Sequence, residues 1–244
     1  MNRPALTLFA SDLHLDAGAP WAIDAFLAFL DGPARECEAL YLLGDLFEAW
    51  VGDDDDDAAN ARACEGLARL TASGTVVYAL HGNRDFLLGE GFERRTGAKL
   101  LPDPVSLDLY GVPTLLSHGD VFCTDDLPYQ ELRSIVRQPG WQRRFLALPL
   151  ATRRELASAA RAGSKAHTER QVPVLMDVND DSVIRAMQVT GTRRLIHGHT
   201  HRPAVHEITV NGAKVQRVVL APWYESASCL AVDAAGARAV PLPR

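Results

Sequence analysis

Short runs of aliphatic residues alternate with longer segments of helical periodicity through the first half of the chain. The runs at 5–10, 39–44 and 75–80 predict three strands of a sheet. The segments between them, 21–32 and 56–73, carry apolar residues at helical spacing and predict crossover helices. This alternation is typical of an α/β fold.

After Gly97 the pattern changes to shorter runs that are separated by turn signals. Gly111, the pair at 211–212 and Gly236 predict turns. We expect this half of the chain to form a second, mainly antiparallel sheet packed against the first. Its strands are expected within residues 105–111, 112–120, 193–203, 204–210, 214–220 and 228–236.

One segment, residues 125–171, interrupts the alternation, and we expect it to be a helical insertion within a single domain that covers residues 1–244. Between 126 and 170 it carries nine Lys or Arg residues against four Asp or Glu, a balance of +5 in a chain of formal net charge −6. Such a run is often a solvated helical face. Interleaved apolar residues, Trp141 and the stretch 145–150, favour a helical hairpin or cap over an anionic, partly apolar ligand.

Composition narrows the classes of protein that fit. The chain has 244 residues and 47% hydrophobic content, enough for one sizeable core. Its net charge of −6 argues against a surface that coats nucleic acid. Four cysteines without CxxC spacing favour a reducing compartment such as the cytosol. The N-terminus has no signal-peptide pattern, and no run approaches the roughly 20 apolar residues of a spanning helix, so we expect a soluble or peripheral protein.

Polar side chains follow the predicted strands, where open α/β sheets bind their ligands. Asp12 and His14 are two residues apart, so in an extended segment both would point to one side and share an ion. His199 and His201 repeat this spacing, and Asp45 offers two oxygens that can bridge ions. The full set of candidate metal ligands is Asp12, His14, Asp45, Asn83, His118, His199 and His201.

The chemistry of this ligand set predicts two adjacent metal ions. Carboxylate, imidazole and amide groups together suit Mn²⁺, Fe²⁺ or Zn²⁺ better than Mg²⁺. The absence of cysteine ligands argues against a structural zinc site.

Several polar residues also fit structural roles. The acid run 53–57 is interpreted as a solvated loop and helix start. Asp45 could cap a helix, and Glu48 and Trp50 could equally support a ligand or simply pack. The remaining histidines are interpreted as structural: His81, His167, His197 and His206.

The segments SDLHL, LLGDLFEAWVGDD, HGNRDF, LLSHGD and HGHTHRP resemble the motifs of the calcineurin-like metallophosphoesterases. The resemblance implies an α/β/β/α sandwich of two mixed sheets with two metal ions. One ion would lie among Asp12, His14, Asp45 and His201. The other would lie among Asp45, Asn83, His118 and His199, so that Asp45 bridges the two.

A narrower resemblance covers nearly the whole chain, through GDLFEAWVGDDD, GNRDFLLG, PLATRRELA and MDVN. These segments are similar to a metallophosphoesterase family of lipid A biosynthesis, whose members use Mn²⁺ to hydrolyse UDP-2,3-diacylglucosamine. The products are UMP and 2,3-diacylglucosamine 1-phosphate, and the insertion is a helical lid over the acyl chains. The resemblance implies a cytoplasmic enzyme peripherally associated with the inner membrane.

Two alternatives remain beside this interpretation. One is a metallophosphodiesterase or phosphatase that acts on a soluble substrate, which would not need a basic and apolar cover. The other is a scaffold that has lost catalysis, which is disfavoured because all seven candidate ligands are present.

Arg84 stands where most relatives of the broad family carry a histidine that is often assigned as a proton donor. Arginine gives up no proton at ordinary pH but binds phosphate through two parallel donors. We therefore expect Arg84 to clamp a diphosphate, and we expect the catalytic groups to be Arg84, His199 and Asp45. Asp85 would either orient Asn83 or Arg84 or cap the helix that follows.

The resemblance also implies contacts between the protein and its substrate. The positions that carry over are Asn83, Arg84, Asp126, Ser164 and His199. The family's pattern S-K-x-x-N-x-x-K is broken here, because Thr168 and Gln171 replace its Asn and Lys. Those two contacts are not carried over, and the candidates to supply the missing charge are Arg161, Lys165 and Arg170.

Overall fold

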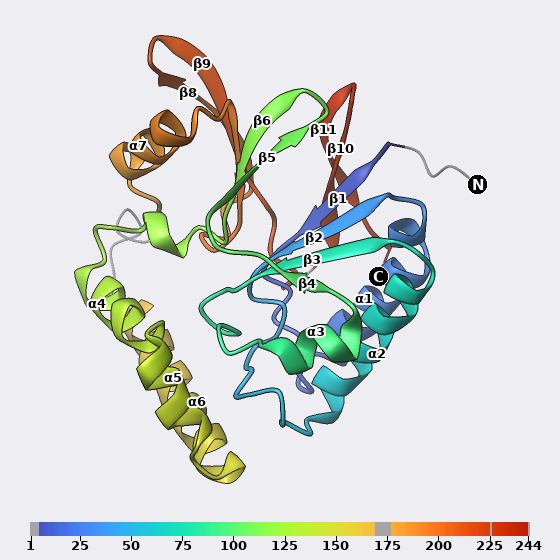
Figure 1. Cartoon of the computed structure of the whole chain (residues 1–244), viewed down its shortest axis with the longest axis vertical. Helices are drawn as coiled ribbons and strands as arrows, with labels where there is room; N and C mark the ends of the chain where they lie inside the picture. Colours follow the sequence, from blue (N-terminus) through green and yellow to red (C-terminus); the bar gives the residue numbers. More distant parts are fainter. Residues whose placement is uncertain (1–4, 169–176, 225, 244) are drawn as a thin grey trace.

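The first sheet of the computed structural model has parallel strands from the first hundred residues at its centre. β1 (Thr7–Ala10), β2 (Ala39–Leu43), β3 (Val76–Leu80) and β4 (Lys99–Leu100) lie side by side in chain order. Every residue of β1 and β2 is buried, since helices cover one face of the sheet and a second sheet covers the other (Figure 1). The structure describes residues 5–168, 177–224 and 226–243. The three strands expected in this half are confirmed.

Three helices cover the outer face of this sheet (Figure 1): α1 (Pro20–Asp31), α2 (Ala58–Ala72) and α3 (Glu90–Thr96). A short 3₁₀ helix, η1 (Pro33–Arg35), follows α1. Helix α2 begins at Asp57, whose carboxylate accepts hydrogen bonds from the backbone N–H groups of Ala59 and Asn60. The helices expected at 21–32 and 56–73 are therefore confirmed.

The second sheet has the strand order β5-β6-β7-β9-β8. Its strands are β5 (Val105–Leu109), β6 (Val112–Leu116), β7 (Arg194–His197), β8 (Ala204–Val210) and β9 (Ala213–Val219). The pairs β5–β6 and β8–β9 are antiparallel, whereas β6–β7 and β7–β9 are parallel. The expectation of a mainly antiparallel sheet is wrong, because the long connection from β6 to β7 allows parallel pairing. Helix α7 (Asp180–Thr190) packs beside this sheet (Figure 1).

The run predicted at 228–236 also lies elsewhere than expected. β10 (Ser228–Asp233) pairs antiparallel with β1 in the first sheet, and β11 (Gly236–Pro241) forms the edge beyond it. Alternation along a strand shows that one face is buried, but it does not show which neighbouring strand completes the ladder. The fold is nevertheless α/β with two mixed sheets, as the resemblance implies.

Aromatic side chains fill part of the layer between the two sheets. Phe9 and Tyr41 stack with ring centroids 5.1 Å apart, and Tyr41 and Tyr78 stack at 4.8 Å. These rings come from the three adjacent strands β1, β2 and β3, at positions that point to the same face. The packing keeps the ends of these strands level, and the loops that follow them carry the candidate ligands.

The basic segment forms three helices rather than a hairpin: α4 (Leu127–Val136), α5 (Pro139–Leu146) and α6 (Leu150–Thr168). Figure 1 shows them extending away from the two sheets. Within the ranges given above, no helix is both long enough and apolar enough to cross a membrane.

Helix α6 is attached to the first sheet through the acid run. The guanidinium of Arg153 is 2% exposed and donates to the carbonyl of Val51 at 2.6 Å and to Asp54 at 2.5 and 2.8 Å. Arg154 pairs with Asp55 and Asp56. The interpretation of 53–57 as a solvated loop is wrong for Asp55, which is only 7% exposed. Asp54 pairs with Arg153 but is 65% exposed, so it is solvated as expected.

Candidate metal centre and active site

The seven candidate ligands lie in loops that follow the carboxyl ends of five strands. Asp12 and His14 follow β1, Asp45 follows β2, Asn83 follows β3, His118 follows β6, and His199 and His201 follow β7. The first three strands belong to one sheet and the last two to the other, so the site forms where the two sheets meet. This is the edge at which α/β folds bind ligands.

The backbone at five of the seven candidate ligands is left-handed and not extended. φ is +55° at Asp12, +48° at His14, +52° at Asp45, +66° at His199 and +54° at His201. The expectation that Asp12-x-His14 and His199-x-His201 converge as extended pairs is therefore wrong. Left-handed residues bring Asp12 and His14 to one group of ligands, whereas His201 joins that group and His199 lies beside Asn83. Non-glycine residues adopt this conformation at a cost of about 1–3 kcal/mol, and such strain clusters at functional sites.

Asp12, His14 and His201 form the first group of ligands. One ligand atom from each lies within 4.8 Å of the others. The Nε2 atom of His201 is 3.2 Å from Oδ1 of Asp12. The Nε2 atom of His14 is buried and has no hydrogen-bond partner, yet it lies 3.7 Å from Oδ2 of Asp45. An unpaired imidazole nitrogen that faces carboxylate oxygens is a ready metal ligand.

Asn83, His118 and His199 form the second group. Oδ1 of Asn83 lies 3.0 Å from Nε2 of His118 and 3.0 Å from Nδ1 of His199. When two donor atoms each lie about 2.1 Å from one ion, and their bonds meet at a right angle at that ion, the donor atoms are about 3 Å apart. The spacing of these three atoms therefore matches the donors around a single ion.

Asp45 lies between the two groups. Its Oδ2 faces Nε2 of His14, and its Oδ1 faces Nε2 of His118, each at 3.7 Å. One carboxylate oxygen is thus directed at each group, as a bridging ligand requires. Oδ1 also accepts a hydrogen bond of 2.8 Å from the backbone N–H of Arg84, which holds the carboxylate in this orientation.

Groups behind the ligands hold the imidazole rings in place. Nδ1 of His14 lies 2.9 Å from Glu48, and Nδ1 of His118 lies 2.9 Å from the backbone carbonyl of Leu43. Each ring can donate from Nδ1 and leave the lone pair of Nε2 for a metal. Glu48 therefore supports a ligand, whereas Trp50 is buried in the core against Phe47.

Asp85 joins two of the ligand-bearing loops. Its carboxylate accepts hydrogen bonds from the backbone N–H groups of Gly82 at 2.8 Å, Leu46 at 2.7 Å and Asp45 at 3.3 Å. These bonds neither orient the side chain of Asn83 or Arg84 nor cap the following helix, whose N-cap is Gly89, so both expectations for Asp85 are wrong. Its role is to hold the loop after β3 against the loop after β2.

Glycines beside the ligands allow this close approach of loops. A Cβ atom at Gly82 would lie 2.1 Å from Oδ1 of Asp45. A Cβ atom at Gly198 would lie 2.1 Å from Oδ2 of Asp12 and from Oγ of Ser11. Gly82 of HGN and Gly198 of HGH are thus required because no side chain fits between these loops.

Electrostatics favour a bound cation at this site. Asp12 and Asp45 are 0% and 2% exposed, and among the described residues only histidines form ion pairs with them. Burial raises the pKa of the Asp45 carboxyl. Burial alone would lower the pKa of His118, but Asp45 and Asp12 outweigh it and raise that pKa to about 9. Buried carboxylates of this kind are stabilised by metal ions, and the donor set present here fits such ions.

Desolvation has the opposite effect on His199. Burial, reinforced by the neighbouring His118, lowers the pKa of His199 to about 3. Its imidazole is therefore neutral at ordinary pH and has a lone pair for a metal.

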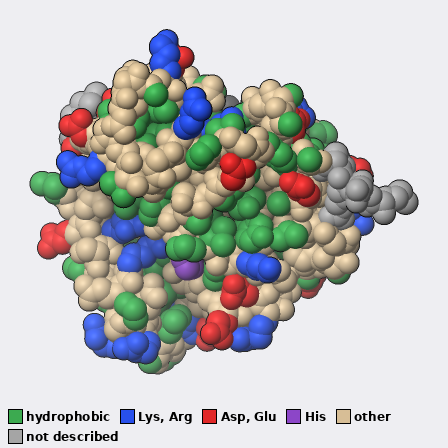
Figure 2. Space-filling view, turned by 45° about the horizontal axis from the view of Figure 1, so that its top comes forward, with side chains coloured by type: hydrophobic (Ala, Val, Ile, Leu, Met, Phe, Trp, Pro, Cys, Tyr) green, Lys and Arg blue, Asp and Glu red, His purple; other side chains and the backbone are tan. Residues whose placement is uncertain are grey.

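Arg84 and Arg137 add positive charge beside the second group. The Nε atom of Arg84 is buried without a hydrogen-bond partner. Arg137, in the turn after α4, donates to the carbonyl of Gly82 at 2.9 Å and lies over the ring of Phe86. On the face shown in Figure 2, a histidine side chain is visible between basic and hydrophobic side chains.

The sequence motifs do not reveal how the helices of the basic segment contact the site. Asp120, in the 3₁₀ helix η2 (Asp120–Phe122), accepts hydrogen bonds from Tyr129 at 2.5 Å and Arg133 at 2.8 Å. Tyr129 also stacks on His199, with ring centroids 6.0 Å apart. The only local signal was that Asp120 closes the motif LLSHGD.

A second aromatic residue, Tyr224, lies against the first group of ligands. It stacks on His14 at 5.4 Å between centroids and contacts His201 edge-on at 5.0 Å. Its side chain is 54% exposed, so it forms part of the rim of the site. No motif in the sequence pointed to this residue.

The remaining candidates are placed as follows. Asp126 begins α4 and accepts a hydrogen bond from the backbone N–H of Tyr129 at 3.1 Å. His81 contacts the carbonyl of Leu88 at 2.8 Å, and His197 is fully buried, as structural histidines would be. The remaining predictions concern side chains that the structure does not describe. They are those of Ser164, Lys165, His167 and Thr168 in the last turns of α6, and of Arg170 and Gln171 beyond it.

With this geometry in view, the chain can be compared with known proteins. A family model described as calcineurin-like phosphoesterase matches residues 6–203, a range that contains all seven candidate ligands. The chain belongs to the calcineurin-like phosphoesterase family, whose members use divalent metal ions.

Individual relatives match over almost their full length. The chain is 47% identical to a protein of Cellvibrio japonicus over 94% of this chain and 96% of that one. It is 48% identical to a protein of Stenotrophomonas maltophilia, again over 94% and 96%, and 48% identical to one of Pseudomonas aeruginosa over 97% and 98%. All three relatives carry the name UDP-2,3-diacylglucosamine hydrolase.

The contact between Glu48 and His14 leads to a prediction about metal affinity. Glu48→Gln replaces the carboxylate that orients His14, and we expect the affinity for Mn²⁺ to fall about 10–100-fold. Calorimetric titration with Mn²⁺ measures the change. Glu36→Gln, at an exposed glutamate outside the site, is the matched control. Equal affinities in the two variants would contradict the role given to Glu48.

Proposed function

We propose that the chain hydrolyses the diphosphate of UDP-2,3-diacylglucosamine to give UMP and 2,3-diacylglucosamine 1-phosphate, a step of lipid A biosynthesis. The observation that carries the proposal is its 47–48% identity, over 94–97% of its length, to proteins named UDP-2,3-diacylglucosamine hydrolase. The buried ligand set supports it, because hydrolysis of a diphosphate needs charge compensation at the phosphoryl oxygens.

The residues support a pair of Mn²⁺ ions as the cofactor. Asp12, His14, Asp45 and His201 would hold one ion, and Asp45, Asn83, His118 and His199 the other. Two ions so held would polarise phosphoryl oxygens and lower the pKa of a water molecule. The mixture of imidazole and oxygen donors suits Mn²⁺ better than Mg²⁺.

Three residues carry the chemistry that the protein itself supplies. Asp45 directs one carboxylate oxygen at each group of ligands and so fixes their relative position. Arg84, with a buried and unpaired Nε, donates to the phosphate oxygens and neutralises the charge that develops on them. His199 is neutral and lies beside Asn83, where it orients the phosphate that leaves. A phosphate leaving group needs little protonation, so an arginine in place of a proton donor suits a diphosphate.

Helices α4 to α6 would form a lid over the acyl chains, with Asp126 and Ser164 as substrate contacts. Six of the ten large apolar side chains that are exposed in the described part of the chain belong to this segment. They are Leu127, Leu132, Ile135, Leu146, Leu148 and Leu156. Exposed apolar groups among basic residues fit an anionic lipid, and they support peripheral association with the cytoplasmic face of the inner membrane.

A phosphodiesterase or phosphatase of soluble substrates is the second candidate. Its support is the broad family alone, since the metal groups would serve any phosphoester. It offers no reason for six exposed apolar residues in a segment attached beside the site. The lipid substrate accounts for both the metal groups and the helices.

The first prediction of this proposed function concerns the substrate and the metal. The purified chain should release UMP from UDP-2,3-diacylglucosamine in Mn²⁺ and detergent, and EDTA should remove nearly all of this activity. UMP release is measured by liquid chromatography, with Mg²⁺ and Zn²⁺ tested in parallel. Hydrolysis of soluble phosphodiesters without release of UMP from the lipid would support the second candidate instead. Undiminished turnover after chelation would exclude the role of the metals.

The second prediction concerns Arg84. Arg84→His should lower kcat/KM for the lipid diphosphate at least about tenfold, because a charge-assisted pair to phosphate is lost. The affinity for Mn²⁺ should stay unchanged, since the Arg84 side chain is not a ligand. Arg94→His, at an exposed arginine of α3, is the control. An Arg84→His enzyme with full activity would remove the clamp from the mechanism.

The third prediction tests the lid. The double substitution Leu132→Ser with Ile135→Ser should lower kcat/KM for the lipid at least about tenfold, because apolar contacts with the acyl chains are lost. Turnover of bis(p-nitrophenyl) phosphate should change less than about twofold, since this substrate has no acyl chain. Val189→Ser changes an exposed residue of α7 and serves as the control. Equal losses on both substrates would contradict the lid.

A further inference from the structure

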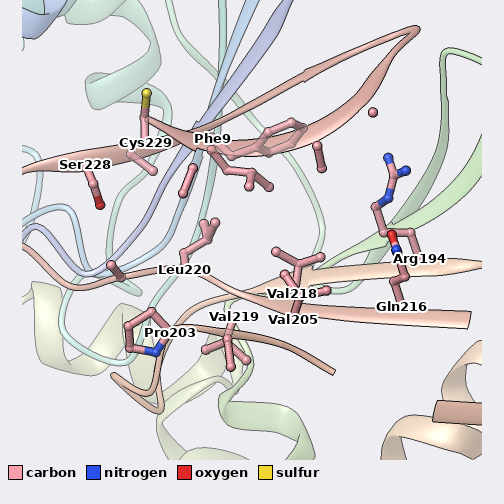
Figure 3. A pocket seen from close by; sticks show the side chains of 17 residues that line it. Phe9, Arg194, Pro203, Val205, Gln216, Val218, Val219, Leu220, Ser228 and Cys229 are labelled. Atoms are coloured by element: carbon pink, nitrogen blue, oxygen red, sulfur yellow. The ribbon is translucent and has the colours of Figure 1, made fainter. Parts of the chain in front are cut away.

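A cavity of about 540 Å³ opens between the edges of the two sheets, and none of the seven candidate ligands lines it. It lies between β8 and β9 of the second sheet and β10 and β11 of the first, where the sheets diverge. In Figure 3, Arg194 and Gln216 lie together at one end, and Phe9, Val218 and Leu220 lie along its length. Its volume is in the range of roughly 300–1,000 Å³ that small-molecule sites occupy.

The walls of the cavity are apolar because alternate residues of each strand face the space between the sheets. Val218 and Leu220 from the second sheet and Phe9 and Leu230 from the first belong to one hydrophobic cluster. Val205 pairs with Val218 on the neighbouring strand and is 65% exposed at the edge. An elongated apolar surface of this kind fits an unbranched hydrocarbon chain.

Arg194 is the one charged residue among those that line the cavity, and it is 7% exposed. Its Nε has no hydrogen-bond partner, and the structure places no acid beside its guanidinium within the described ranges. Desolvation alone lowers the pKa of Arg194. Arg217, on the adjacent strand β9, is buried to a similar degree but pairs with Asp177 at 3.2 Å. Arg194 therefore has the environment of a buried cation whose counter-ion is a ligand.

We propose that this cavity binds a single-chain fatty acid, with the carboxylate on Arg194 and the hydrocarbon chain along the apolar walls. Arginine presents parallel donors that match a carboxylate. One positive charge matches one negative charge, and a phosphate monoester would bring a second charge that no lining residue compensates. The site is separate from the proposed diphosphatase centre and does not depend on that function.

Binding is measured on the full chain by displacement of the fluorescent fatty acid cis-parinarate. Tetradecanoate should displace it with saturation, and tetradecanol should bind at least about tenfold more weakly, because it cannot pair with the guanidinium. Shorter acids should lose affinity by about fourfold for each methylene removed. Equal affinities for the acid and the alcohol would overturn the proposal.

Three variants locate the bound acid. Arg194→Met should weaken tetradecanoate at least about tenfold and leave tetradecanol unchanged, with the thermal stability kept or raised since an unpaired buried charge is removed. Arg193→Met, at the exposed arginine next to it, should change neither. Ala239→Phe fills the cavity from an exposed position of β11 and should weaken both ligands.

Asp45→Ala separates this cavity from the proposed active site. The variant should bind tetradecanoate as the unaltered chain does, while it loses diphosphatase activity. If Asp45→Ala weakens the acid and Arg194→Met does not, the acid occupies the active site and the proposal is wrong. If the unaltered chain does not release UMP from the lipid, the proposed function is wrong. The binding result for Arg194→Met is unaffected by that outcome.

Discussion

Two carboxylates, Asp12 and Asp45, are buried with only histidines as charged partners in the described structure, and the arrangement of the site depends on this. A buried carboxylate is costly unless charge compensates it. The histidines surround the pair, and bound metal ions, as proposed, would supply the remaining positive charge. Because the ligands come from loops of both sheets, those loops must approach closely. Left-handed backbone at five ligands and the absence of side chains at Gly82 and Gly198 make that approach possible.

The polar groups around the ligands link the site to the helices outside it. Asp85 holds two ligand loops together through backbone N–H groups, and Glu48 orients His14. Asp120, two residues after a ligand, anchors Tyr129 and Arg133 of α4. The helices with exposed apolar residues are thus attached to the loop that carries His118. Under the proposed function, such an attachment would place the lid beside the groups that act on the diphosphate.

The strands of the first sheet could be predicted because each is a short aliphatic run between helical segments. That the seven candidate ligands lie together could be predicted because metal chemistry favours a few residue types at strand ends. The sequence predicted that Asp12 and His14 point to one side of an extended segment. This was wrong, because packing against neighbouring loops imposes a left-handed backbone at both residues. The prediction that the acid run is solvated failed at Asp55, because Arg154, the partner beside which it is buried, is distant in the sequence. Tyr129 and Tyr224 carried no local signal.

The sequence by itself determined the α/β class, the candidate ligands and the basic, partly apolar character of the segment after residue 125. These follow from composition and periodicity, which act over a few neighbouring residues. Only the tertiary structure decided that β10 joins the first sheet and that Asp45 directs one oxygen at each ligand group. It also decided that Arg194 is buried with no acid beside it among the described residues. Such features depend on which distant segments meet, and a local pattern of residues does not specify its partner.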